Sequence, residues 1–386
     1  MGSKSELAGC RLILVGSLPP PATGPSVSFE MLHRSLQERG AICAVINLAK
    51  KSYSRDLGTN LIRSVRILKA LTQYFWKLTC GYRNVYINIA QSLQGFCRDS
   101  MLIWLGKAFG ARIVVHLRGG NYDNFYHEQT KFVRFLIKIT LRQVNRILVL
   151  GEGLRAMYAF DSHLTDRIYV VYNGLSIEAE GMAKTIEHLG GNTIHVLYLS
   201  NLIETKGYFH VLESIKILRD TYNIKVACTF AGQFITSRDD ETVRSAENAK
   251  IRFCEYLDKY DLRGQVRFMG AVSGYTKWQL LRDSHFFVLP THYVNEGQPV
   301  SIIEAMAYGC VVITTNYRAI PDLVIDGRTG IFVDYGEPKQ IASAIANLCA
   351  SPLRYKQMSE SANMRYRMHF TMSAYLDAII PHLTEA

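Results

Sequence analysis

The residues best suited to chemistry lie in one stretch, where two glutamates flank the start of a predicted helix. Pro299 is placed to begin that helix, and Gln298 before it is a poor N-cap, so the N–H groups of the first turn are available to an anion or a sugar hydroxyl. Glu296 precedes this turn, and Glu304 lies roughly 7.5 Å along the helix from Pro299. Taken alone, a pair of helical carboxylates is more often a solvated face.

Two short apolar runs position this helix. The run HFFVLP, residues 285–290, predicts a buried strand before it, and CVVITTN, residues 310–316, predicts another after it. Gly309 stands where a helix commonly ends in a glycine. The pattern is therefore strand, loop, helix, strand, with both glutamates at the loop and first turns.

The whole string of motifs resembles one family. The segments EG, P, EAMAYG, VVIT, IPDLV, DG and TGIFV follow each other between residues 296 and 333. This order resembles the signature of the family-four retaining glycosyltransferases of GT-B fold, also called glycosyl transferases group 1, of the bacterial surface-polysaccharide type. The resemblance extends more weakly over nearly all of the chain.

The resemblance implies an α/β fold with two Rossmann-like domains facing across a cleft. We expect an acceptor-binding domain over residues 1–178, a nucleotide-sugar domain over 190–368, and a terminal helix, 369–386, that crosses back to the first domain. The length of 386 residues is sufficient for two such cores, and 48% hydrophobic residues with a mean hydropathy near zero describe an ordinary soluble α/β protein.

In the second domain, the resemblance implies a donor site after several strands. Lys206 matches the family lysine that contacts the donor diphosphate, whereas Asn201 stands where the family usually has arginine. We expect Arg118 or Arg318 to compensate for that missing cation, or donor binding to be weak. The loop from Gly270 to Ser273 would hold the nucleotide base through backbone groups. Alternatively, Lys206 is a surface lysine before a helix.

In the first domain, the strand ARIVVHL ends in His116, and Arg118 follows it. The family commonly has a histidine near the reacting sugar at this place, and Arg118 occupies a second histidine position, which makes it a phosphate-binding candidate. Gly24, in the loop after the first strand, would let the backbone approach the donor phosphates. A lone histidine is more often structural, and this loop taken alone is a plain turn.

The position of five candidate residues relative to the predicted strands can be stated without the family resemblance. Gly24, His116, Arg118, Lys206 and Glu296 each lie just beyond a predicted parallel strand, where open α/β sheets bind ligands. The predicted catalytic residues are His116, Lys206 and Glu296. The predicted donor-binding residues are Gly24, Arg118, Asn201, Lys206, Gly270, Val272, Glu296, Gly297, Gln298, Pro299, Val300, Ser301 and Glu304.

The charge is distributed unevenly. The chain carries 44 Lys and Arg against 33 Asp and Glu, net +11, and residues 1–180 hold 23 and 12 of these, which is again +11. All of the excess positive charge therefore lies in the first half, and it predicts an anionic partner for the first domain alone.

Two segments of this half read as basic amphipathic helices. The first covers residues 51–83, where seven cations alternate with apolar and aromatic residues, and the second covers 131–146, where Lys131, Arg134, Lys138 and Arg142 fall at helical spacing. Such helices suit an anionic membrane surface, and the alternative is two ordinary solvated helices. No apolar run is long enough to span a membrane, and the eight cysteines lack metal-ligand spacing, so we expect a cytoplasmic protein, peripheral on the membrane.

These observations predict a glycosyltransferase that uses a UDP- or GDP-linked sugar and acts with retention, which the resemblance implies, on a lipid-linked or glycan acceptor. No D-x-D sequence is present, so we expect no metal and no other cofactor. Two other classes stay open. A nucleotide-sugar epimerase would leave the basic half unexplained. A nucleic-acid binder would suit the net charge, although the carboxylate pair argues against it, and we expect no nucleic acid partner.

Overall fold

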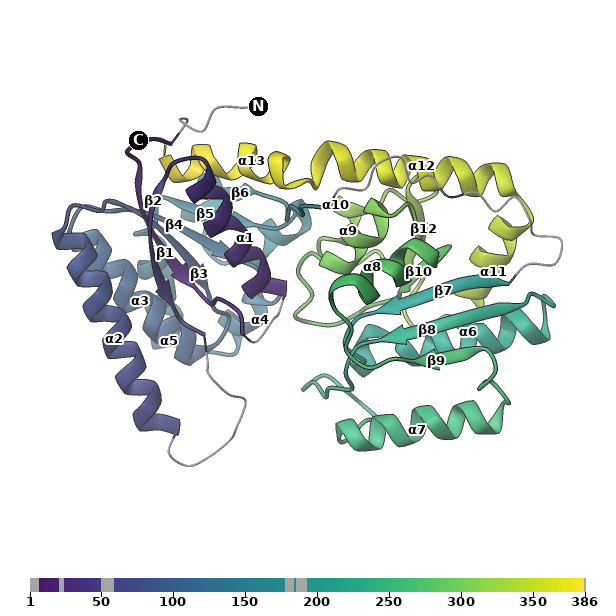
Figure 1. The fold of residues 1–386 in the computed structure, drawn as a ribbon. Helices are drawn as coiled ribbons and strands as arrows, with labels where there is room; N and C mark the ends of the chain where they lie inside the picture. Colours follow the sequence, from purple (N-terminus) through teal and green to yellow (C-terminus); the bar gives the residue numbers. More distant parts are fainter. Residues whose placement is uncertain (1–6, 21–23, 50–58, 178–183, 185–192, 385–386) are drawn as a thin grey trace. The chain divides into compact units, whose positions relative to one another are not determined.

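The computed structural model describes residues 7–20, 24–49, 59–177, 184 and 193–384. The chain divides into two compact units. The first contains the residues up to Gly174 and those from Met372 onward, and the second contains Leu175 to Thr371. Each unit is built on its own six-stranded sheet (Figure 1). None of the helices within these ranges is long and apolar enough to cross a membrane.

The sheet of the first unit is parallel and has the order β2-β1-β3-β4-β5-β6. Its strands are β1 (Arg11–Gly16), β2 (Ile42–Asn47), β3 (Asn84–Ile89), β4 (Arg112–Leu117), β5 (Arg146–Val149) and β6 (Ile168–Val170). The central strand β4 is almost continuously apolar and buried, as expected for a parallel strand that is covered on both faces.

The helices of the first unit divide between the two faces of this sheet. Helices α1 (Gly24–Glu38) and α13 (Met372–Thr384) pack on one face, and α2 (Thr59–Thr79), α3 (Leu93–Ala108) and α5 (Lys131–Leu141) lie together on the other (Figure 1). The unit also contains α4 (Tyr122–His127) and two 3₁₀ segments, Glu152–Tyr158 and Ser162–Arg167. Helices therefore cover both faces of this sheet, and for this reason its strands can be apolar throughout.

Helix α13 joins the core of the first unit although it comes from the end of the chain. Its buried side chains Tyr375, Ile379 and Leu383 belong to the same cluster as Leu14 and Phe29. Arg146 donates to the carbonyl of Pro381, and Arg39 pairs with Asp377 at 3.3 Å. The last helix is thus an integral part of the first unit.

The sheet of the second unit is also parallel, with the order β12-β11-β10-β7-β8-β9. Its strands are β7 (Ile194–Leu199), β8 (Val226–Ala231), β9 (Val266–Phe268), β10 (Phe286–Leu289), β11 (Val311–Thr314) and β12 (Gly330–Phe332). Its helices are α6 (Tyr208–Asp220), α7 (Ala246–Lys259), α8 (Gly274–Asp283), α9 (Val300–Ala307), α10 (Ile320–Leu323), α11 (Pro338–Cys349) and α12 (Pro352–His369), and Glu204–Lys206 forms a 3₁₀ turn.

Helix α9 is the buried centre of the second unit. It ends as predicted, because Gly309 adopts a positive φ of 68° and donates to the carbonyl of Met306. Helix α12 satisfies further carbonyls at this end: Ser359 Oγ donates to Gly309 O and Asn363 Nδ2 to Ala307 O, each at 2.6 Å. The carboxyl end of α9 is therefore fixed by buried hydrogen bonds, while its amino end faces the loop that follows β10.

Candidate active site

The loops that carry the predicted donor site follow neighbouring strands of the second sheet. Strands β11, β10, β7, β8 and β9 are adjacent in that order, and all of them run in the same direction. The loop after β11 carries Arg318, the loop after β10 carries Glu296, the segment after β7 carries Lys206, and Gly270 follows β9. Parallel strands bring these four segments to one edge of the sheet, where α/β folds bind ligands.

Lys206 and Glu296 form an ion pair at this edge. The Lys206 ammonium lies 3.1 Å from Glu296 Oε2, and the two side chains are only 14% and 8% exposed. Lys206 Nζ also donates to Ser200 Oγ at 3.2 Å, and Glu296 accepts a hydrogen bond from Thr291 Oγ1. The ammonium has three N–H donors, so one donor remains for a ligand after these two partners. The structure thus brings together two of the three predicted catalytic residues.

The backbone around this pair is closely packed. Gly207 has a φ of 76°, and a Cβ atom built there would lie 2.4 Å from the carbonyl oxygen of Pro290. The His292 N–H donates to the carbonyl of Thr205 at 2.7 Å. Glycine alone permits this approach of the two loops, and the contact holds Lys206 beside the loop of Glu296.

The start of α9 differs from the sequence expectation by one position. The helix begins at Val300, and Pro299 takes the N-cap position without a side-chain cap. Gly297, Gln298 and Pro299 are buried, whereas Val300 and Ser301 are partly exposed. The first turn therefore lacks a capping side chain, as predicted from Gln298 and Pro299.

Glu304 lies in the second turn of α9 and pairs with a residue that the sequence analysis missed. Lys277, on α8, donates to Glu304 Oε1 at 2.6 Å, and the two side chains are 22% and 9% exposed. Burial raises the pKa of Glu304, and the charge and hydrogen bond of Lys277 oppose that rise. In the part of the chain that the structure describes, no ion pair joins Glu304 to Lys206. The two predicted carboxylates therefore have different lysine partners.

The other predicted donor residues of the second unit lie in the loops after β7 and β9. Asn201 is exposed, and its Oδ1 accepts a hydrogen bond from the Gln233 N–H at 3.4 Å. Gly270 adopts a φ of 65° with open space where a Cβ would be, and Val272 is partly exposed. Of the two cations expected to replace the missing arginine at 201, Arg318 belongs to the same unit and the same sheet edge as Lys206.

In the first unit, His116 is fully buried at the end of β4. The hydroxyl of Tyr86 donates to Asn88, so the contact of 2.9 Å between Tyr86 and His116 Nδ1 requires the histidine to donate from Nδ1. Burial and the nearby Arg118 charge hold the pKa of His116 well below its usual range. Its Nε2 is thus an unprotonated acceptor, and it has no hydrogen-bond partner among the described residues.

Arg118 is engaged by protein groups. Its guanidinium donates to Asn173 Oδ1 at 2.6 Å and to the hydroxyls of Tyr375 and Tyr86 at 2.9 and 3.3 Å. These bonds tie the residue after β4 to α13 and to Asn173, which lies close to the boundary at Gly174. Arg118 therefore has a structural role within the first unit, and a phosphate would be an additional partner. Gly24 is the first residue of α1, and residues 21–23 before it lie outside the described residues.

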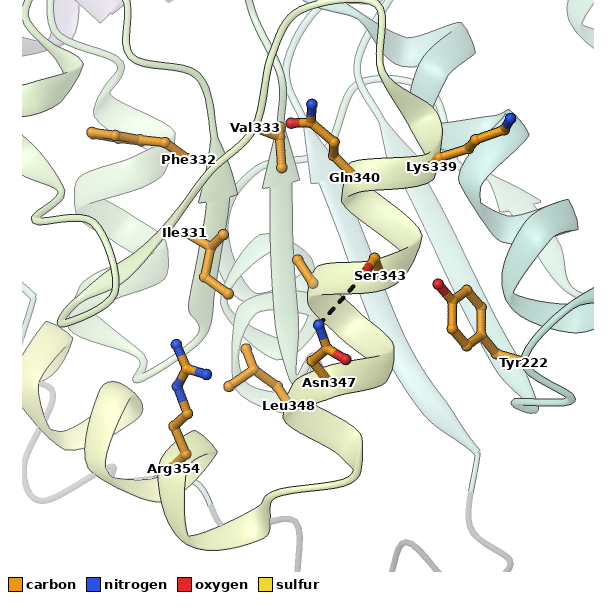
Figure 2. A pocket seen from close by; sticks show the side chains of 11 residues that line it. Tyr222, Ile331, Phe332, Val333, Lys339, Gln340, Ser343, Asn347, Leu348 and Arg354 are labelled. Carbon is orange, nitrogen blue, oxygen red and sulfur yellow. Dashed lines mark hydrogen bonds between the residues drawn. The ribbon is translucent and has the colours of Figure 1, made fainter.

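The second unit also has a cavity away from the predicted site. It encloses about 530 Å³ beside β12 and α11 and is lined by Ile331, Lys339, Gln340, Asn347 and Arg354, among others (Figure 2). None of the predicted site residues lines it. This cavity is therefore distinct from the predicted donor site, which lies at the strand edge that holds Lys206 and Glu296.

The first unit contains a larger cavity at the carboxyl end of β2. It has a volume of about 790 Å³ and lies between that strand and α2, with Pro20, Asn47, Arg66 and Lys69 in its lining. A smaller cavity of about 250 Å³ shares Arg66 and is also lined by Arg98 from α3. These cavities combine an apolar wall with guanidinium and ammonium groups, which suits an amphipathic anion.

Known proteins resemble this chain in sequence and in fold. Residues 184–365 match the family model described as glycosyl transferases group 1. The uncharacterized glycosyltransferase MJ1069 of Methanocaldococcus jannaschii is 20% identical over 77% of this chain and 74% of its own length. The capsular polysaccharide biosynthesis glycosyltransferase CapM of Staphylococcus aureus is 26% identical over 55% of this chain and 48% of its own. Among the curated relatives, the matched share of their own length ranges from 20% to 74%.

The solved structures resemble the chain over nearly its whole length. The crystal structure of Anabaena Alr3699/HepE in complex with UDP and glucose has a TM-score of 0.72 and 14% identity, and it covers 97% of this chain and 100% of its own. At this identity the likeness is one of fold, and it confirms the expected GT-B class. Residues 184–365 therefore form a domain of the glycosyl transferases group 1 family, in a chain that has the GT-B fold of two Rossmann-like domains.

Proposed function

We propose that the protein is a retaining glycosyltransferase that transfers a sugar from a nucleoside diphosphate donor to an acceptor bound by its first unit. The observation that carries this proposal is the buried pair of Lys206 and Glu296 beside the uncapped start of α9, within the domain that matches glycosyl transferases group 1. HepE, which has a similar fold, was crystallised with UDP and with UDP-glucose. We propose a UDP- or GDP-linked sugar as the donor here.

In the proposed reaction, negative charge develops on the leaving diphosphate. Lys206 can direct its remaining N–H donor to this diphosphate, and the N–H groups of the first turn of α9 point out of the helix without a side-chain cap. Donors fixed before the reaction stabilise the transition state without a cost of reorganisation. Glu296, held by Thr291, would orient the donor sugar, and Glu304 would accept hydrogen bonds from the ribose hydroxyls.

We propose that these groups supply the positive potential without a metal or other cofactor. The ammonium of Lys206 and the positive end of the α9 dipole converge on one sheet edge, and Arg318 belongs to the same edge. His116 would accept a hydrogen bond at Nε2 from a substrate hydroxyl, since this atom is the unprotonated side of a neutral ring.

We propose an acceptor that carries both an anionic group and an apolar part, such as a lipid-linked glycan. The cavity between β2 and α2 supports this proposal, because Arg66 and Lys69 line it together with Val45, Val65 and Ala70. Within the described residues, Arg66 and Lys69 have no carboxylate partner, so their charges are available to a ligand. CapM is named for capsular polysaccharide biosynthesis, and we propose a role in surface polysaccharide assembly for this chain also.

We further propose that α2, α3 and α5 rest on the cytoplasmic face of an anionic membrane. These helices lie together on one face of the first sheet, and Trp104 on α3 donates to Thr140 on α5 at 3.1 Å. Large apolar side chains stand exposed on their outer surface, among them Trp76 at 65% and Phe132 at 69%. Lys69, Lys131 and Lys138 accompany them on α2 and α5. Exposed aromatic residues among cations are typical of interfacial helices.

Two of the four cations that helical spacing placed on one basic face of residues 131–146 are bound to other protein groups in the structure. Helix α5 ends at Leu141, and Arg142, which follows it, donates to Asp161 at 2.8 and 2.9 Å. Arg134 donates to the carbonyl of His127. We therefore assign the membrane contact to the lysines of α2 and α5 and to the aromatic residues beside them.

The proposal can be tested in two steps. First, unfolding temperatures are measured with UDP, GDP and other nucleoside diphosphates, and a ligand at 100 times its Kd should stabilise the fold by about 2.7 kcal/mol. Second, the matching nucleotide sugars are incubated with and without lipid-linked acceptors, and the anomeric configuration of the product is determined by NMR. Transfer with retention supports the proposal. An isomerised sugar formed from the donor alone would indicate an epimerase, and binding of DNA or RNA at physiological salt without nucleotide binding would contradict it.

A further inference from the structure

Two adjacent side chains of α8 contact Glu304 of α9 and Tyr308, the C-cap residue of that helix, which are one helical turn apart. Lys277 pairs with Glu304, and the ring of Trp278 stacks on Tyr308 with centroids 5.9 Å apart and an interplanar angle of 21°. The Lys277 ammonium also lies 4.1 Å from the centre of the Trp278 ring. The lysine is thus held on two sides, and its position relative to α9 is set by the aromatic contact beside it.

The pair satisfies only one of the two carboxylate oxygens. Lys277 bonds to Oε1, and no described residue donates a hydrogen bond to Oε2. Glu304 has a side-chain exposure of only 9%, and an isolated carboxylate at such a site is poorly solvated. With Lys277 present, the carboxylate can remain charged and keeps Oε2 as an acceptor for a ligand.

We propose that Lys277 is a positioning residue for the donor. It holds Glu304 as an anion in one orientation, so that the free oxygen can accept hydrogen bonds from the hydroxyls of the donor's ribose. This inference rests on the proposed function, because it assigns a task to Glu304 in nucleotide binding. It adds a residue outside the glutamate motif, from a helix that lies earlier in the chain.

The inference leads to a defined dependence on pH. Burial raises the pKa of Glu304, and Lys277 is the charged group that counteracts this rise. Tyr308, the C-cap residue of α9, also interacts electrostatically with this carboxylate, and burial raises its pKa, so it stays neutral at ordinary pH. The positive charge of Arg282 on α8 partly opposes this rise in the pKa of Tyr308. Without Lys277, protonation of Glu304 should begin at a higher pH, and nucleotide binding should therefore be lost at a higher pH than in the wild type.

The experiment measures the Kd of UDP and GDP by calorimetry between pH 5 and 8. Lys277→Met removes the charge and keeps the aliphatic stem, Lys277→Arg retains the charge, and Lys250→Met on α7 is the control for an exposed lysine. We expect Lys277→Met to bind about tenfold more weakly at the acidic end, as for loss of hydrogen bonds to a charged acceptor, and to approach the wild type at the alkaline end. Lys277→Arg should recover most of the affinity, and Lys250→Met should match the wild type throughout.

The outcomes separate this inference from the proposed function. If the wild type binds the nucleotide and Lys277→Met has a parallel pH profile, Lys277 does not position Glu304 and the inference is overturned while the donor site stands. The same holds if Lys277→Arg binds as weakly as Lys277→Met, because the charge is then irrelevant. If the wild type binds no nucleoside diphosphate, the proposed function fails and the inference fails with it. Circular dichroism of each variant verifies that the fold is retained.

Discussion

Replacing Lys206 with methionine should lower both stability and turnover, and the structure allows the stability loss to be estimated. At the 3.1 Å separation of Lys206 and Glu296, the Coulomb attraction is about 5 kcal/mol for an effective dielectric constant of about 20. Desolvation offsets most of this in the intact pair. In the variant, however, the Glu296 carboxylate stays buried with only the hydroxyl of Thr291 donating to it among the described residues, and breaking such a pair costs about 3–5 kcal/mol.

The assay is urea unfolding followed by circular dichroism, with Lys216→Met as the matched control. Lys216 and Asp220 also form an ion pair in the second unit, at 3.6 Å, but their side chains are 33% and 43% exposed. An exposed pair of this kind contributes at most about 0.5 kcal/mol. We expect the free energy of unfolding to fall several times further in Lys206→Met than in Lys216→Met. The double variant with methionine at 206 and 296 should recover much of the loss, since neither charge then remains.

Turnover provides the second measurement. Lys206 would matter most when the diphosphate leaves, so Lys206→Met should lower kcat more than it raises the Kd of the donor. Equal unfolding midpoints for Lys206→Met and Lys216→Met would refute the argument that the pair is buried and coupled. Wild-type turnover in Lys206→Met would refute its assignment to the leaving group.

Four further predictions concern the donor site, the metal, the membrane and the fold. Glu304→Ala should weaken nucleotide binding by about 1–3 kcal/mol, measured by calorimetry, and an unchanged Kd would exclude it from the site. Transfer activity should survive EDTA, and a complete loss that magnesium or manganese restores would contradict the proposal of metal independence. Replacement of Lys69, Lys131 and Lys138 by glutamate should release the protein from anionic vesicles at low salt without changing nucleotide binding. Failure of the wild-type protein to sediment with such vesicles would contradict the proposed membrane contact of α2 and α5. Gly207→Ala should destabilise the second unit by at least about 1–2 kcal/mol in urea, because of its φ of 76° and the contact with Pro290, and wild-type stability would contradict that reasoning.

Local patterns in the sequence predict the frame of the site. The apolar runs before Glu296 and after Gly309 form the strands β10 and β11, and the helix between them lacks a side-chain cap as expected. In a parallel sheet, the segments after β7 and β10 lie at the same edge. For this reason the sequence alone places Lys206 and Glu296 in one predicted site, and the structure shows them as an ion pair. The roles of these residues in binding and catalysis stay predictions.

The partners of the site residues were not predictable in the same way. Lys277 precedes Glu304 by 27 positions and belongs to another helix, so no helical or strand spacing relates the two. The bond from Arg118 to Tyr375 joins positions 257 apart. Helical periodicity placed Arg142 on a basic face, yet its partner Asp161 follows by 19 positions. Such pairs depend on how helices pack on a sheet, which patterns within one element do not encode.

The position of α13 has a consequence for synthesis of the chain. The core around Leu14, Phe29 and Tyr86 is completed by Tyr375 and Ile379, which the ribosome adds only after the whole second unit. Domains ordinarily fold in the order in which they emerge, but here the earlier unit must wait with an open apolar face while the later one can close on itself. The nascent first unit is therefore the part of this protein that most needs protection from aggregation, and a ribosome stalled before residue 372 would leave it unfinished.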